Sequence, residues 1–154
     1  PEYAERASIF SEKVKDVHEF LVNLPFTPPT GRVEKRVTYQ DSCHLANPQR
    51  ITDAPRTLIR SIPGLQFVEL ERSDVCCGGG GTYTITERDF SSRVLKSKMK
   101  NILETGAEIV ATANPGCILQ LQYGAQRYGV PVQINYVTDL LDESYQSENP
   151  KTGV

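Results

Sequence analysis

Short β-prone runs alternate with helical segments along this sequence, and the alternation constrains its fold more than any other feature. The runs span residues 36–40, 65–70, 108–112 and 130–137. Helix-ending glycines stand between them at Gly64, Gly106 and Gly129. Because each intervening helix must return the chain to the same edge of a sheet, the pattern predicts an α/β fold with a small, about four-stranded parallel sheet and flanking helices.

The first 30 residues carry a helical pattern of their own. Apolar residues recur at helical spacing, which predicts one amphipathic helix that packs a stripe against the core and ends before Pro25. The stripe consists of Phe10, Val14, Val17, Leu21 and Leu24. His18 lies off this stripe, so we expect it on the solvent surface. The expected regions are an amphipathic helix with its linker (1–30), a cysteine-rich domain (31–146) and a flexible tail (147–154).

Composition and charge narrow the classes of function. The chain has 154 residues, of which 38% are hydrophobic, and this is enough for one core that folds without disulfides. The formal net charge of −2, with no basic run interleaved with aromatics, argues against a nucleic-acid partner. No apolar stretch approaches the roughly 20 residues that span a bilayer, and no signal-peptide pattern is evident, which indicates a cytoplasmic protein. The sequence begins at Pro1 in mid-pattern, so we expect a domain excised from a longer subunit.

All four cysteines fall directly after β-prone runs. Cys43 follows the first run, Cys76 and Cys77 follow the second, and Cys117 follows the third. The carboxyl ends of parallel strands share one edge of a sheet, and α/β proteins place their sites on the loops that leave this edge. The sequence therefore predicts that four sulfurs from three loops meet in one region.

Several roles fit such a group of cysteines. Free cysteines are often buried as small hydrophobes, and thiols can pair, although adjacent Cys76 and Cys77 would close a strained ring. Clustered thiolates repel one another unless a cation offsets their charge, and thiolates select zinc, Cu(I) or iron–sulfur clusters. The long intervals between the cysteines do not match paired zinc-finger knuckles. Metal ligation is the interpretation we favour.

The glycine run from Gly78 to Gly81 admits two interpretations. Gly78 and Gly79 would let the backbone approach a cluster and donate N–H groups to its sulfurs. The run could also cradle a phosphate, but neither the Walker lysine nor a spaced glycine fingerprint is present. Donation to sulfur is the stronger hypothesis.

Asn114 and His44 are further candidates beside the cysteines. Asn114 followed by Pro115 is typical of a helix start, which favours capping over ligation and places Cys117 in the first helical turn. There the helix dipole favours the thiolate. His44 could ligate, donate a hydrogen bond to a sulfur or be an ordinary loop histidine. No Ser/His/Asp arrangement is apparent, so we assign no catalytic residue.

Three motifs, Cys43-His-Leu, Cys76-Cys-Gly and Asn114-Pro-Gly-Cys, resemble the cysteine-rich CCG domain of heterodisulfide reductase and its relatives. Within that group four longer motifs are most similar to the C-terminal part of the glycolate oxidase iron–sulfur subunit: Asp41-x-Cys-His-Leu, Cys76-Cys-Gly-Gly-Gly-Gly-Thr-Tyr, Thr105-Gly-Ala and Asn114-Pro-Gly-Cys-x-Leu-Gln. The resemblance implies an electron-transfer domain that holds an iron–sulfur cluster, [4Fe-4S] in type, through its cysteines. It also implies an oxidoreductase of several subunits, in which a flavin-containing dehydrogenase subunit oxidises a 2-hydroxy acid and other subunits pass electrons to a membrane acceptor. Such a domain would be inactive alone and would reach the inner face of the membrane only through its partners.

The sequence departs from the family pattern at one position. The pattern ends in Cys-x-x-Cys, and Asn114 stands at the first of these positions. A five-cysteine noncubane cluster would therefore lose a ligand, so a cubane cluster and zinc both stay open. Two alternative functions follow from the same residues: a structural zinc module at a subunit interface, and a thiol–disulfide redox domain that uses Cys76 and Cys77.

Overall fold

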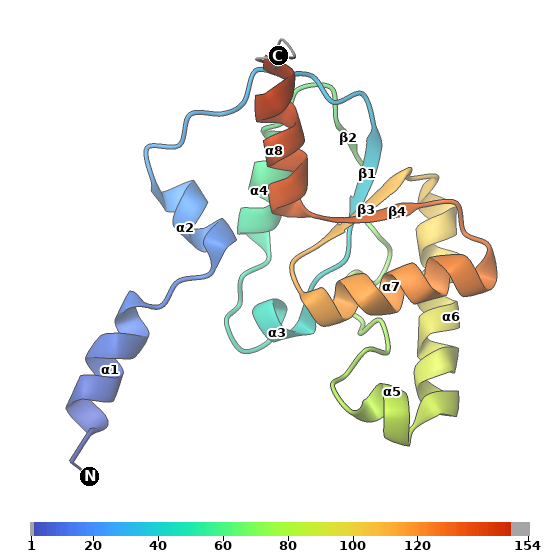
Figure 1. The fold of residues 1–154 in the computed structure, drawn as a ribbon, viewed down its shortest axis with the longest axis horizontal. Coiled ribbons are helices and arrows are strands. Elements are labelled where there is room, and N and C mark those ends of the chain that lie inside the picture. Colours follow the sequence, from blue (N-terminus) through green and yellow to red (C-terminus); the bar gives the residue numbers. More distant parts are fainter. Residues whose placement is uncertain (1, 149–154) are drawn as a thin grey trace, which may run out of the picture.

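A four-stranded parallel sheet forms the centre of the computed structural model, which describes residues 2–148. The strands are β1 (Arg36–Tyr39), β2 (Gln66–Phe67), β3 (Ile109–Thr112) and β4 (Gln133–Tyr136). Their order in the sheet is β2-β1-β3-β4 and all three pairings are parallel (Figure 1). The predicted α/β class and parallel sheet are confirmed.

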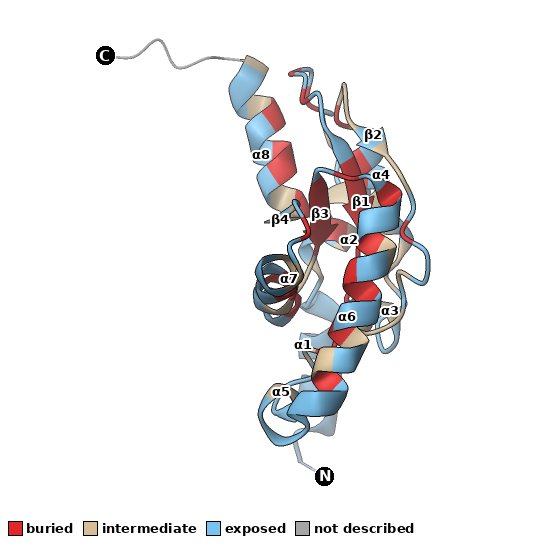
Figure 2. Cartoon of the chain, turned by 90° about the vertical axis from the view of Figure 1, so that its right-hand side faces the viewer, coloured by how far each residue is buried: buried red, intermediate tan, exposed pale blue. Residues whose placement is uncertain are grey.

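Two layers of helices cover the sheet. The helices after β1 are α3 (Cys43–Ala46), α4 (Asp53–Arg60), α5 (Tyr83–Thr86), α6 (Arg88–Thr105), α7 (Pro115–Tyr128) and α8 (Val137–Glu148). One core cluster joins α4 and α8 to the sheet, and a second joins α6 and α7 to it. Strand β3 supplies both, because alternate side chains face opposite sides: Ile109 and Ala111 belong to the first cluster and Val110 to the second. Figure 2 shows the buried residues along the strands and as stripes on α6 and α8.

The N-terminal segment differs from the prediction of one packed helix. It forms α1 (Ala4–Lys13) and α2 (Val17–Asn23), and the Asp16 side chain caps α2 by accepting a hydrogen bond from the His18 N–H. Capping by Asp16 ends the continuous helical pattern. Helix α1 buries no residue and projects from the body in Figure 1. Of the predicted stripe only Leu21, in α2, packs against the core, and the packing predicted for the other four residues is wrong.

The prediction that His18 is solvated is also wrong. The residue is only 3% exposed, and its Nδ1 atom lies 2.7 Å from Asp16 Oδ1. Helix α2 packs on α4, and His18 lies one helical turn before Leu21 and Val22, which pack against the core, so it shares the buried face of α2.

The first two residues of the expected tail are helical. Ser147 and Glu148 belong to α8, and the Glu148 carboxylate accepts a hydrogen bond from the Gly31 N–H. Residues 149–154 lie outside the described residues. Within the described part of the chain, no helix has the length and apolar character needed to cross a bilayer.

Candidate metal centre

The four cysteines meet at the carboxyl edge of the sheet. Cys43 is the first residue of α3, Cys76 and Cys77 lie in the loop after β2, and Cys117 lies in the first turn of α7. All four line one cavity of about 620 Å³, and α3, α5 and the first turn of α7 surround it at the end of the strands (Figure 1). The predicted convergence of three loops is confirmed.

The four thiols are free, and three of them perturb one another's pKa values. Hydrogen bonding to Cys77 and burial both raise the pKa of Cys76. Hydrogen bonding with Cys117 is the main cause that raises the pKa of Cys77 to about 11. The same contact lowers the pKa of Cys117, despite its burial. The predicted direction at Cys117 is therefore found, but the neighbouring thiol is its largest cause.

The glycine run lies against these sulfurs. The Gly78 N–H donates to Cys76 Sγ at 3.3 Å, which is one of the backbone donors expected here. Gly78 has a φ of 89°, and a Cβ added to it would lie 2.6 Å from the Ser91 carbonyl oxygen. A Cβ on Gly79 would lie 3.4 Å from Cys77 Sγ. A side chain at Gly78 would thus disturb the backbone that donates to the sulfur.

Asn114 caps α7, as the sequence favours. Its Oδ1 atom accepts hydrogen bonds from the Gly116 N–H at 2.8 Å and the Cys117 N–H at 3.3 Å. The side-chain oxygen that would ligate a metal is therefore engaged with the backbone. His44 is exposed and lines the same cavity, and its role stays open.

A buried amide fixes the loop that leads to the cysteine pair, and sequence analysis missed it. Gln40, at 1% exposure, donates from Nε2 to the carbonyl oxygens of Asp41 (2.7 Å), Ser73 (2.8 Å) and Val75 (3.2 Å). It thereby ties the loop after β1 to the loop after β2. No local signal could have shown this, because the acceptors in the second loop lie more than thirty positions further along the chain.

An ion pair joins the same two loops. Arg56 of α4 donates to both oxygens of Asp41 at 2.8 Å, and their side chains are 11% and 6% exposed. Burial is the largest single influence and raises the pKa of Asp41, but the hydrogen bonds from Arg56 and Ser73 together with the positive charge of Arg56 hold the pKa below its usual value. Arg56 also donates to the hydroxyl of Ser73 at 3.2 Å. The sequence motif contains Asp41 but gives no indication of its partner.

Four thiols that line one cavity form a donor set that an iron–sulfur cluster can use. Within residues 2–148, no three His, Cys, Asp or Glu side chains are arranged to hold one metal ion. A closed zinc site places all its sulfurs about 2.3 Å from one point, whereas the irons of a cluster lie at separate corners and spread their ligands. The hydroxyls of Ser42 and Thr112 are buried without hydrogen-bond partners at this edge, where cluster sulfur could accept from them.

Comparison with known proteins places the chain in a family. The model of the CCG cysteine-rich domain matches residues 37–122, which cover three of the four strands and all four cysteines. This chain belongs to the CCG cysteine-rich domain family. The identification agrees with the resemblance of its cysteine motifs.

Curated relatives extend the similarity over nearly the whole chain. The probable glycolate oxidase iron–sulfur subunit of Bacillus subtilis is 43% identical over 148 residues, which are 94% of this chain and 33% of the relative. Lactate utilization protein A is 31% identical in Bacillus licheniformis and 32% identical in Oceanobacillus iheyensis, each over 143 residues and 92% of this chain. The chain spans about a third of the first relative and about 60% of the other two.

Proposed function

We propose that this CCG domain is the electron-transfer module of an oxidoreductase subunit similar to the glycolate oxidase iron–sulfur subunit. Cys43, Cys76, Cys77 and Cys117 hold a [4Fe-4S] cluster. The observation that carries the proposal is that three loops, distant in sequence, bring four free thiols to one cavity. The relative's printed name supplies the iron–sulfur chemistry, and the donor set is compatible with it.

A bound cluster would supply one-electron storage, and the residues of this chain determine where it sits and what it faces. Cys77 and Cys117 are buried, whereas Cys43 and Cys76 are partly exposed. The centre is therefore closed towards the sheet and open towards the surface, where another redox subunit can approach. A flavin-containing dehydrogenase subunit is the partner we propose at this opening, within an assembly that is cytoplasmic or held at the inner face of the membrane by its partners.

The thiol contacts also support one competing function. Cys76, Cys77 and Cys117 line one cavity, so a disulfide substrate could oxidise two of these thiols to a disulfide while it is itself reduced to two thiols, without any metal. Such a domain would exchange disulfides rather than single electrons. Its thiol count would fall on oxidation and recover on reduction in the presence of a chelator.

Anaerobic reconstitution with ferrous iron and sulfide tests the proposal. We expect iron and acid-labile sulfide in equal amounts, about four of each per chain, and an electron paramagnetic resonance signal on reduction. Single Cys→Ser variants at the four positions should lose most of the iron while retaining the circular dichroism spectrum of the fold. Asn114→Ser, which keeps a capping oxygen, should retain the iron. A colourless protein with stoichiometric zinc and no sulfide would overturn the proposal.

A further inference from the structure

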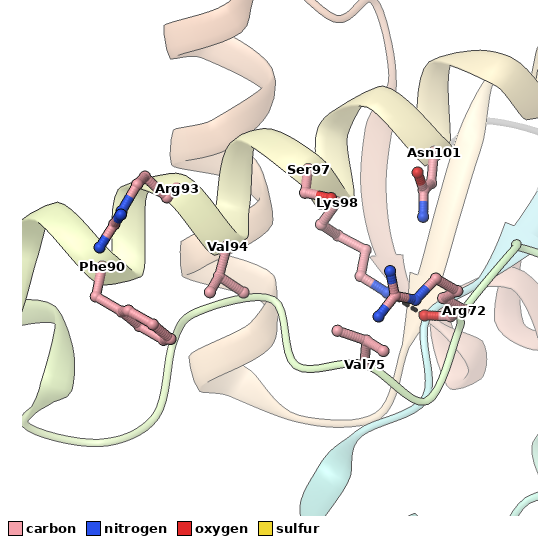
Figure 3. Close-up of a pocket in the computed structure, with 8 residues that line it drawn as sticks. All are labelled: Arg72, Val75, Phe90, Arg93, Val94, Ser97, Lys98 and Asn101. Carbon is pink, nitrogen blue, oxygen red and sulfur yellow. Dashed lines mark hydrogen bonds between the residues drawn. The ribbon is translucent and has the colours of Figure 1, made fainter.

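Helix α6 buries a lysine beside the turn that leads to the Cys76-Cys77 pair. Lys98 is 2% exposed, and within residues 2–148 it forms no salt bridge with a carboxylate. Its Nζ atom donates to the Arg72 carbonyl oxygen at 2.6 Å, as Figure 3 shows. Lysines are almost never fully buried unless paired, because a buried ammonium loses its hydration. The position of Lys98 therefore calls for a compensating interaction.

The acceptor of this hydrogen bond belongs to the turn that precedes the cysteine pair. The Arg72 carbonyl oxygen also accepts from the Val75 N–H at 3.1 Å, and Arg72 has a φ of 55°. Cys76 follows Val75 directly. Lys98 thus fixes a turn whose next residue is a proposed ligand, and it does so from a different element than Gln40 and Arg56.

Lys98 lines a small cavity together with Arg72 and Val75, and its helix packs on Cys77 through Leu95 and Met99. Burial lowers the pKa of Lys98 to about 8, and Cys77, Asp74, Asp41 and Cys76 act in the opposite direction, in that order of size. Asp41 already pairs with Arg56, and Asp74 is exposed. Cys77 is buried and Cys76 is partly exposed, and their sulfurs are the remaining groups whose negative charge an ammonium can offset once they bind metal as thiolates.

We infer that Lys98 is a positioning residue of the metal centre, which anchors the turn before Cys76 and offsets the charge of the Cys76 and Cys77 thiolates. The inference rests on the proposed cluster-binding function. A neutral donor would anchor the Arg72 carbonyl equally well without the cost of burying a charge. The charge is explained by the anionic ligands beside it, because a nearby cation favours the more negative, reduced form of a redox centre.

Substitutions at Lys98 separate anchoring from charge. Lys98→Gln retains a hydrogen-bond donor and removes the charge, and Lys98→Met removes both. Lys100→Met is the matched control, since Lys100 lies on the same helix with a side chain that is 76% exposed. Each protein is reconstituted anaerobically, its iron and sulfide are measured, and its midpoint potential is determined by redox titration.

We expect both Lys98 variants to shift to a more negative potential, with about a tenfold change in the ratio of oxidised to reduced cluster, or about 59 mV for one electron. Lys100→Met should match the wild type. An unchanged potential in fully loaded Lys98→Gln would overturn the inference and leave the proposed function standing. A shift of the midpoint potential in Lys98→Met but not in Lys98→Gln would show that Lys98 acts only through its hydrogen bond, and this result would also overturn the inference. A wild-type protein that takes up neither iron nor sulfide would overturn the proposed function and this inference together.

Discussion

The chain on the two sides of the Cys76-Cys77 pair is held in two different ways. Before the pair, residues 72–75 accept hydrogen bonds from buried Gln40, from Arg56 and from Lys98, which belong to the end of β1, α4 and α6. After the pair, residues 81–83 are exposed, and α5 buries no residue. Residues 72–75, the upstream side, are therefore positioned by contacts with the core. Residues 81–83, the downstream side, are held by few contacts.

This difference indicates how the centre is prepared for metal. The upstream loop is fixed by interactions that involve no sulfur, so the cysteine pair is in place before any metal binds. The later glycines of the run lack such contacts, and no heavy atom lies within 4 Å of a Cβ added to Gly81. The loop before the proposed ligands Cys76 and Cys77 is thus held rigidly, whereas the loop after them can change its conformation when a group binds.

The largest expected effect on the upstream side comes from removing the ion pair between Arg56 and Asp41. Arg56→Met leaves Asp41 buried without its partner, so we expect the free energy of unfolding to fall by about 3 to 5 kcal/mol. Chemical denaturation of the metal-free protein measures this change. Arg60→Met is the control, because Arg60 is 54% exposed and pairs with exposed Glu69, and its effect should stay within about 0.5 kcal/mol. Equal effects of the two substitutions would show that the upstream loop is not fixed by the pair.

On the downstream side, we expect substitutions after Gly78 to be tolerated, whereas a substitution of Gly78 itself should destabilise the fold. Gly78→Ala forces a Cβ to 2.6 Å from the Ser91 carbonyl oxygen at a positive φ, so we expect it to cost about 2 to 3 kcal/mol. Gly80→Ala meets only Tyr83 Cβ at 3.7 Å and should stay within about 0.5 kcal/mol. Thermal unfolding of both variants measures the contrast. A large loss in Gly80→Ala would place the boundary between the rigid and adjustable parts further along the chain.

The same contrast separates what the sequence predicts from what it does not. The strands, the helix ends at Gly106 and Gly129 and the cap at Asn114 follow from residues that act on their immediate neighbours. Convergence of the cysteines also follows, because the topology of a parallel sheet brings its loops to one edge.

The supporting side chains depend instead on contacts between distant segments. Gln40 and Lys98 resemble ordinary polar residues of a strand and a helix, and only the folded chain shows that both are buried against the 72–75 turn. His18 illustrates the same limit: its helical position indicated solvent, but the packing of α2 on α4 buries it. Local patterns predict elements, and the partners of a buried polar group lie elsewhere in the sequence.

The smallest expected effect concerns Lys98, the one side chain holding the upstream loop that we expect to destabilise the metal-free protein. Lys98→Met removes a buried charge and one hydrogen bond, so we expect the metal-free variant to be about 1 to 2 kcal/mol more stable than the wild type at pH 7. Below pH 8 the lysine is charged in both the folded and the unfolded protein, and the burial cost is fully present. Between pH 8 and about 10.5 the folded protein loses this proton first, so the wild type gains stability and the difference should shrink towards zero by about pH 10.

The other groups that face Lys98 do not obscure this comparison. Asp74, Asp41 and the two thiols are present in both proteins, so their titration largely cancels in the difference. Denaturation curves of wild type and Lys98→Met at pH 7, 8.5 and 10 measure it. A variant that is less stable than the wild type at pH 7 would contradict this prediction, because the hydrogen bond of Lys98 to the Arg72 carbonyl oxygen would then outweigh the cost of burying its charge.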